Sequence, residues 1–412
     1  MTKVDQIISS KWVLISSKDE PQKNQSVVII GNKIHDILDS DEALKNYKTD
    51  RHIKLESHIL LPGLINPYSQ LSEQFINEIF SNQSLTDTLN RKELSSHEHY
   101  TNIVARLTTV KLIKSGTTSH TNVSPYPDIF IEIFNKVGIK LFSGLPMFSR
   151  KNNWSNSDED SFKKNLAIYD KYKLYPNTKM FFCLFESQPV SQTMLSKIAN
   201  VANELELPIV LVNDQTRSLE KMKQIFEPLI DLNLINKNFT CVDFPLHTYI
   251  FELIEKYGIN VVLSDVQEAI LANQDKRNNL SLFIKKFKTN LDMSLIRNIE
   301  HIYFKNEYKM SVSEISNLFF KLINKNAAKV VSLENSSGSL EANNNADLIS
   351  INITKSDVIK SDIMRLHFFD SNHDSMIDNV WIAGKHIYNN RKLVTINEHI
   401  LYDEIELLSR PR

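Results

Sequence analysis

The stretch Leu60–Gln70, LLPGLINPYSQ, organises the interpretation of the whole chain. Two leucines are followed by a Pro-Gly break, and the apolar pattern resumes at Leu64–Asn66. This pattern is typical of a buried strand that runs into a turn. Tyr68 and Gln70 follow two residues apart, so on an extended chain both side chains point to the same side. Neither is a usual ligand of a transition metal.

Size and composition are those of an ordinary globular protein. The chain has 412 residues, 42% hydrophobic and 24% charged, with a net charge of −1. Such a length suits a barrel with a smaller appended domain, and the balanced charge argues against nucleic-acid and anionic-membrane partners. Because no secretory leader and no long apolar run is present, we expect a cytoplasmic protein without membrane association. Cys183 and Cys241 lie in apolar contexts that favour buried free thiols.

Strand-like and helix-like segments alternate from Pro62 to about Leu340. This rhythm is typical of βαβ units that build a parallel sheet. It predicts a (β/α)8 TIM-like barrel over residues 62–340. The eight expected strands are Leu60–Asn66, Thr117–Val123, Lys140–Pro146, Met180–Phe185, Pro208–Asn213, Phe239–Phe244, Asn260–Asp265 and, with the least pronounced pattern, Leu280–Ile284.

Both ends of the chain have a different, β-rich pattern with short strands and turn signals. A small sheet of this kind cannot bury both of its faces alone, so it needs partners from elsewhere in the chain. We therefore expect residues 1–61 and 341–412 to form one composite, β-sandwich-like domain. Its expected strands are Lys11–Ser16, Ser26–Ile30, Ile53–Leu61, Ala346–Ile351, Ile377–Ile382 and Lys385–Tyr388, followed by a helix at Glu398–Ser409.

Acidic residues follow four consecutive expected strands of the barrel. They are Glu186, Asp214, Asp243 and Asp265. Ligands of this fold bind at the C-terminal ends of the strands, where clustered carboxylates can do acid–base work. The alternative is that these acids only cap the helices that follow. His247, just beyond the sixth strand, could face the same pocket, whereas His120 on the second strand suits a packed, hydrogen-bonded role better.

Several motifs give the chain a resemblance to a known family over almost its full length. In order and spacing they resemble those of the amidohydrolase superfamily, in its chlorohydrolase and 5′-methylthioadenosine/S-adenosylhomocysteine deaminase branch. The resemblance implies a metal-dependent barrel hydrolase with a composite β domain. The matching stretches are WVLI at 12–15, KSGTT at 114–118, NLDM at 290–293, NAAK at 326–329, GSLE at 338–341 with ADL at 346–348, and VWIAGK at 380–385.

The same resemblance implies that the metal site of the family is degenerate here. The family's His-x-His pair falls on Tyr68 and Gln70, and its His-x-x-Glu motif falls on Val212 and Gln215. Valine cannot ligate a metal, and glutamine cannot act as a base. The strand-six histidine falls at or next to Cys241. The positions implied to contact substrate are Tyr68, Gln70, Asp87, Phe185, Val212, Gln215 and Cys241.

Strand eight is the last part of the site that the resemblance places. The family's final metal aspartate falls near Lys286 and Phe287, and the interval before Asn290 is shorter than in the family. We therefore expect a barrel that is distorted around this strand. We also expect no divalent metal and no other cofactor, because a metal site needs about three protein ligands.

Two functions follow from these observations. The first is a pseudoenzyme that has lost the metal ligands and the base, and that binds a small molecule in the barrel mouth or a protein partner. The second is a deaminase-like hydrolase of carbon–nitrogen bonds with a non-standard, metal-free site. Its candidate catalytic residues are Glu186, Asp243, Asp265 and His247. The resemblance further implies a homodimer.

Overall fold

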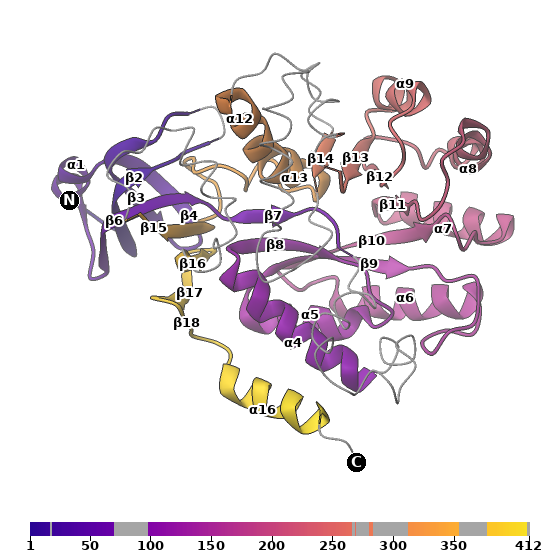
Figure 1. The fold of residues 1–412 in the computed structure, drawn as a ribbon, viewed down its shortest axis with the longest axis horizontal. Helices are drawn as coiled ribbons and strands as arrows, with labels where there is room; N and C mark the ends of the chain where they lie inside the picture. The colour runs from indigo at the N-terminus through magenta and orange to yellow at the C-terminus, as the bar shows by residue number, and fades with distance from the viewer. Residues whose placement is uncertain are drawn as a thin grey trace.

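The computed structural model describes residues 1–16, 19–69, 98–265, 268, 280–282, 312–353 and 377–409. These residues form two large sheets, one of them covered by helices, and strands from the two ends of the chain lie side by side (Figure 1). No helix within these ranges is long and apolar enough to cross a membrane.

The larger body is a curled sheet of eight parallel strands. Its order is β14-β13-β12-β11-β10-β9-β8-β7, so each strand pairs with its neighbour in the sequence. All eight expected strands are confirmed. In the described residues β7 and β14 do not pair, and the sheet is an open, TIM-like half-barrel. The strands are β7 (Leu64–Asn66), β8 (Thr117–Asn122), β9 (Lys140–Pro146), β10 (Thr178–Phe185), β11 (Ile209–Val212), β12 (Phe239–Val242), β13 (Asn260–Leu263) and β14 (Leu280–Leu282).

The helices between the strands begin and end at recognisable capping residues. Ser157, Ser191 and Ser218 each accept a hydrogen bond from a backbone amide of the first helical turn. Gly138 ends α5 in the left-handed region, at φ 102°, where glycine is not strained. The helices are α4 (Glu98–Lys114), α5 (Pro127–Val137), α6 (Asp158–Tyr172), α7 (Gln192–Glu204), α8 (Leu219–Asp231), α9 (Thr248–Tyr257), α12 (Val312–Ile323) and α13 (Lys325–Val330).

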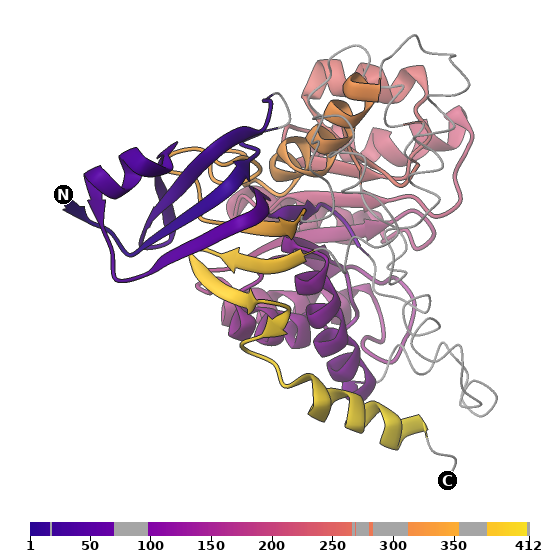
Figure 2. The ribbon, with the colours of Figure 1, turned by 60° about the vertical axis from the view of Figure 1, so that its left-hand side comes forward.

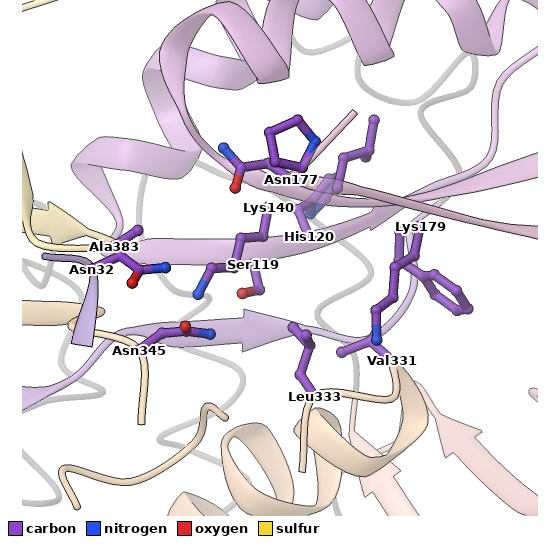
Figure 3. A pocket seen from close by; sticks show the side chains of 13 residues that line it. Asn32, Ser119, His120, Lys140, Asn177, Lys179, Val331, Leu333, Asn345 and Ala383 are labelled. Atoms are coloured by element: carbon purple, nitrogen blue, oxygen red, sulfur yellow. The ribbon is translucent and has the colours of Figure 1, made fainter. Parts of the chain in front are cut away.

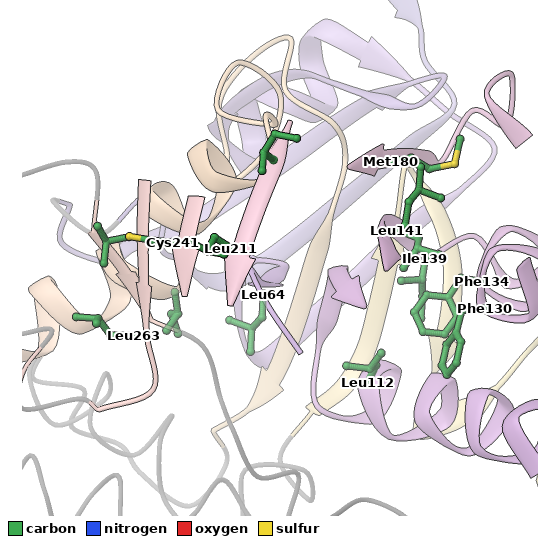
Figure 4. Packing of buried hydrophobic residues seen from close by; sticks show 14 of the residues in the cluster. Leu64, Leu112, Phe130, Phe134, Ile139, Leu141, Met180, Leu211, Cys241 and Leu263 are labelled. Carbon is green, nitrogen blue, oxygen red and sulfur yellow. The ribbon is translucent and has the colours of Figure 1, made fainter. Parts of the chain in front are cut away.

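The two faces of the curled sheet carry different clusters of buried side chains. On the outer face, Leu141, Leu211 and Cys241 pack with residues of the surrounding helices (Figure 4). On the inner face, Phe142 and Val212 pack with other strand residues and with alanines and valines of α13 and the residue after it. Neighbouring residues of a strand therefore point to opposite faces, as the pleat requires. Helix α13 contacts β7, β13 and β14 and fills the inner face where the sheet is open.

The second sheet joins the two ends of the chain. Its order is β18-β17-β16-β15-β6-β2-β3-β4, and the central contact is the antiparallel pairing of β6 with β15. The expectation that both termini share one sheet system is confirmed. The strands are β2 (Gln6–Val13), β3 (Gln22–Ile30), β4 (Lys33–Asp39), β6 (His52–Pro62), β15 (Leu348–Asn352), β16 (Ile377–Ile382), β17 (Lys385–Asn389) and β18 (Lys392–Leu393).

Four further elements complete the described part of the fold. Strands β1 (Thr2–Lys3) and β5 (Tyr47–Lys48) pair beside α1 (Ser40–Asn46) at the edge of the terminal sheet. The C-terminal helix α16 (Glu398–Ser409) leaves this sheet and lies along α4 (Figure 2). Ion pairs link it there through Lys114 with Glu398 and through Arg106 with Glu404.

The stretch Leu60–Asn66 connects the two sheets. Strand β6 ends at Pro62 in the terminal sheet, and β7 begins two residues later in the curled sheet. The residue between them, Gly63, donates its amide to the carbonyl of Asp347 at 3.0 Å. A Cβ atom at position 63 would lie 2.3 Å from the hydroxyl of Thr118, so the close approach of the two segments requires glycine.

Candidate functional site: the C-terminal edge of the curled sheet

Three expected site residues share the inner face near the C-terminal ends of their strands. Tyr68, Phe185 and Val212 are all buried in the same cluster. Burial, together with Cys183, Asp214 and Asp243, raises the pKa of the Tyr68 phenol well above its ordinary value. The phenol is therefore neutral over the physiological range, and Tyr68 contributes no charge to this part of the site.

An aromatic shelf borders the same edge. The rings of Phe148 and Phe185 are stacked, with centroids 5.5 Å apart and planes inclined by 7°, and Trp154 meets Phe148 edge-on at 6.0 Å. Flat ligand rings stack favourably on such surfaces. Phe148 and Trp154 are not among the site residues expected from the sequence. The available signal was an aromatic residue directly after β9, in Met147–Arg150.

Two of the strand-end acids connect neighbouring loops. The Glu186 carboxylate, after β10, accepts two hydrogen bonds from the loop after β11. The donors are the Thr216 hydroxyl at 2.5 Å and the backbone amide of Gln215 at 3.3 Å. The Asp243 carboxylate, after β12, accepts from the Ser264 amide after β13 at 2.8 Å. These contacts order the edge of the sheet, and any proton transfer by these acids has to compete with them.

The other acidic and imidazole candidates serve local turns. Asp265 accepts a hydrogen bond from the Glu268 amide at 2.8 Å, three residues on. Exposed His247 is the N-cap of α9, and its Nδ1 accepts from the Tyr249 amide at 3.5 Å. The capping interpretation therefore describes Asp265, and His247, expected to face the pocket, also caps a helix. Asp214 is exposed and accepts from the hydroxyl of Ser187.

Cys241 does not line the mouth, and that expectation is wrong. The residue pairs with Leu211 on the outer face and is buried against the helices, where burial raises the pKa of its thiol to about 12. On β12 the inner face is formed instead by Thr240 and Val242, which pair with Val210 and Val212. The resemblance had therefore placed the strand-six position one residue away from the inward-facing side chain.

The remaining expected residues divide into described and undescribed positions. Gln215 is exposed in the loop after β11, at the same edge as Glu186. His120 is packed as expected: its Nε2 lies 3.1 Å from the Ser69 hydroxyl, and burial lowers its pKa to about 3. Gln70, Asp87 and the strand-eight segment around Lys286, Phe287 and Asn290–Met293 lie outside the described residues.

Comparison with known proteins finds distant relatives over nearly the full length of the chain. No family model matches the chain. It is 21% identical to a 5-methylthioadenosine/S-adenosylhomocysteine deaminase of Teredinibacter turnerae, over 96% of this chain and 95% of the relative. It is 24% identical to a 5′-deoxyadenosine deaminase of Methanococcus aeolicus, over 96% and 97% of the two chains.

Solved structures show the same fold. An adenosine deaminase of Xanthomonas campestris with bound zinc superposes with a TM-score of 0.80 at 16% identity, covering 98% of each chain. The zinc complex of the atrazine chlorohydrolase TrzN of Arthrobacter aurescens gives 0.74 at 12% identity, over 98% of this chain and all of that one. The chain is thus a deaminase-like protein of amidohydrolase fold, with distant full-length relatives in the methylthioadenosine/S-adenosylhomocysteine deaminase branch.

The zinc of these structures can be tested against the donor groups present here. In the described ranges no three His, Cys, Asp or Glu side chains lie close enough together to hold a metal ion. At the inner ends of β11 and β12 stand Val212 and Val242, which offer no donor atom, and the Tyr68 phenol nearby is neutral. The described part of this edge therefore does not fit a divalent metal.

Proposed function

We propose that this protein binds a nucleoside, or a similar heterocycle with a flat ring, at the C-terminal edge of the curled sheet, and that it does so without metal-dependent hydrolysis. The observation that carries the proposal is that buried Tyr68 and Val212, which the resemblance places at metal-ligand positions, line the inner face there. A metal and its bound hydroxide supply the nucleophile in deaminases of this fold type. Without a group of metal donors among the described residues of this edge, we assign binding to it.

The aromatic shelf supports the ligand class. Half-buried Phe148, stacked on buried Phe185, offers a flat apolar surface at the edge where the polar side chains of Glu186 and Gln215 lie. Purine rings combine a flat π-surface with hydrogen-bonding edges, so they match this combination. The names of the relatives point to the same class, because both are deaminases of adenosine derivatives.

Hydrolysis of a carbon–nitrogen bond is the second candidate, and the comparisons favour it. The similarity to deaminases extends over 93–98% of the chain and is spread through both sheets. In this case Glu186 is the described residue best placed to act as a base, since it lies at the strand ends and is half-buried. It would first have to release the Thr216 hydroxyl.

One experiment separates the two candidates. Metal content of the purified protein is measured by mass spectrometry, binding of 5′-methylthioadenosine by calorimetry, and ammonia release in a coupled assay. We expect saturable binding, far less than one metal per chain and no ammonia above the buffer rate. Phe148→Ala should weaken binding about tenfold, equal to ~1.4 kcal/mol, through the loss of stacking. Tyr402→Ala, at an exposed aromatic of α16, is the matched control and should bind normally.

Two results would overturn the proposal. Absence of methylthioadenosine binding would remove the ligand class. About one equivalent of zinc, iron or nickel together with ammonia release would establish the hydrolase instead, and Glu186→Gln would then show whether that carboxylate takes part.

A further inference from the structure

A cavity of about 190 Å³ lies at the opposite end of the curled sheet, near the N-terminal ends of β9 and β10. Its walls come from both sheets. Ser119, Lys140 and Lys179 belong to β8, β9 and β10, whereas Asn32 and Ala383 come from turns of the terminal sheet. The proposed nucleoside site is at the other end of the same strands, so this cavity is independent of it.

The lining of the cavity is positively charged. It includes two lysines and no aspartate or glutamate. Lys140 forms an ion pair with Asp347, which is buried behind the wall. The Lys179 ammonium instead donates a 2.6 Å hydrogen bond to the carbonyl of Ser332, and the Glu334 carboxylate acts on it electrostatically without an ion pair. His120 adds no charge, because burial lowers its pKa to about 3. A cavity with this lining attracts anions.

A buried hydroxyl marks where such an anion would be bound. Ser119 is 2% exposed, and its Oγ has no hydrogen-bond partner among the described residues. Figure 3 shows this hydroxyl, the Lys140 ammonium and the amide of Asn345 directed towards the same space. A buried hydroxyl left without a partner is destabilising, and an accepting oxygen of a ligand would recover that loss.

The rest of the wall is apolar and limits the size of the ligand. Phe142, Val331 and Leu333 face the cavity beside the polar groups. The volume is below the ~300–1,000 Å³ typical of sites for drug-sized molecules. Lys179 is exposed, so the cavity is open to solvent on that side. A compact ligand with one anionic end and a short apolar body matches this wall.

We propose that this cavity binds a small organic acid, whose carboxylate accepts hydrogen bonds from the Ser119 hydroxyl and from a lysine ammonium and whose apolar body packs against Phe142 and Leu333. Charge-assisted hydrogen bonds to a carboxylate are stronger than neutral ones, and Lys179 can supply one if its side chain turns from the Ser332 carbonyl into the cavity. No bond is made or broken.

Calorimetric titration with benzoate tests the proposal, with benzamide as the neutral analogue and inorganic phosphate as an anion without an apolar body. We expect saturable binding of benzoate, with benzamide and phosphate at least tenfold weaker. Lys179→Gln should weaken benzoate binding about tenfold, equal to ~1.4 kcal/mol. Lys173→Gln, at an exposed lysine beyond the end of α6, is the matched control and should bind normally.

Ser119→Ala adds a test that separates ligand binding from a structural role. Because the hydroxyl has no partner among the described residues, its removal should leave the melting temperature unchanged or raised while it weakens benzoate binding several-fold. The proposal fails if benzoate does not bind saturably, if benzamide or phosphate binds equally well, or if Lys179→Gln and Ser119→Ala bind like the parent protein. Methylthioadenosine binding should not change in either variant, so the two proposals stand or fall separately.

Discussion

At the scale of single residues, Gly63 shows how one position can hold two sheets at close range. A Cβ atom there would meet three atoms of the Thr118 side chain at 2.3–2.9 Å. Thr118 is 1% exposed and β-branched, so it has little freedom to move away. We expect Gly63→Ala to lower the free energy of unfolding by about 1–3 kcal/mol through overpacking. Urea denaturation followed by circular dichroism measures this change.

A double-mutant cycle identifies the cause of that loss. Thr118→Ala removes the two atoms nearest to the added methyl group, so it should recover part of the stability in the Gly63→Ala background. If the loss of stability in the double variant equals the sum of the losses in the two single variants, the clash with Thr118 is not the reason for glycine at this position.

At the scale of secondary-structure elements, the strands of the curled sheet were predictable but their faces were not. Both faces of a parallel sheet are buried, so its strands are apolar throughout and carry no alternation that identifies the inner side. In Phe239–Val242 the sequence offers Cys241 and Val242 equally, and only the pairing with β11 shows that Val242 faces inwards. A displacement of one residue reverses the face, which explains the error at Cys241.

The terminal sheet depends on one carboxylate that links several of its strands. Asp378 on β16 accepts hydrogen bonds from His58 on β6 at 2.9 Å, from Asn352 on β15 at 3.1 Å and from Arg391 before β18 at 2.5 Å. Burial opposes ionisation of Asp378, but these donors, Arg391 and His58 first, outweigh it and lower the pKa of the carboxyl group.

This lowered pKa makes the stability of the protein dependent on pH. The contribution of Asp378 is fully present above the unfolded pKa of ~3.9 and is lost as the pH falls through the lower folded pKa. We expect Asp378→Asn to lower the free energy of unfolding by about 1–3 kcal/mol at neutral pH. The difference from the parent protein should shrink below pH ~4. A difference that stays constant from pH ~7 to pH ~3 would contradict the pKa argument.

At the scale of the whole molecule, the sequence predicted both bodies of the fold, because their rhythms differ. Alternating strands and helices indicated the curled sheet, and the short strands at both ends indicated a shared sheet. The shorter interval around strand eight indicated a distorted barrel, and in the described residues the sheet is open between β7 and β14. The aromatic residue after β9 was visible in the sequence, but its stacking on Phe185 at the end of the next strand, β10, was not. The expected dimer, the cytoplasmic location and the domain boundaries stay predictions.

Lys140 and Asp347 connect the two bodies through a buried ion pair. Lys140 begins β9 of the curled sheet, and Asp347 directly precedes β15 of the terminal sheet; their side chains are 11% and 5% exposed. Asp347 also accepts hydrogen bonds from the Ala383 amide at 2.9 Å and from the Ser337 hydroxyl at 3.2 Å. The carboxylate therefore has fixed partners from several segments, while the lysine supplies its balancing charge.

Removing the lysine alone should therefore lower the free energy of unfolding more than removing both charges. Lys140→Met leaves a buried carboxylate uncompensated, which typically costs about 3–5 kcal/mol, and we expect a loss of that order in the free energy of unfolding. Lys140→Met with Asp347→Asn keeps the hydrogen bonds of residue 347 without a buried charge, so the double variant should be more stable than Lys140→Met alone. Calorimetric unfolding measures both effects. If the double variant is as unstable as the sum of the single variants, the ion pair does not couple the two sheets, because independent sites add.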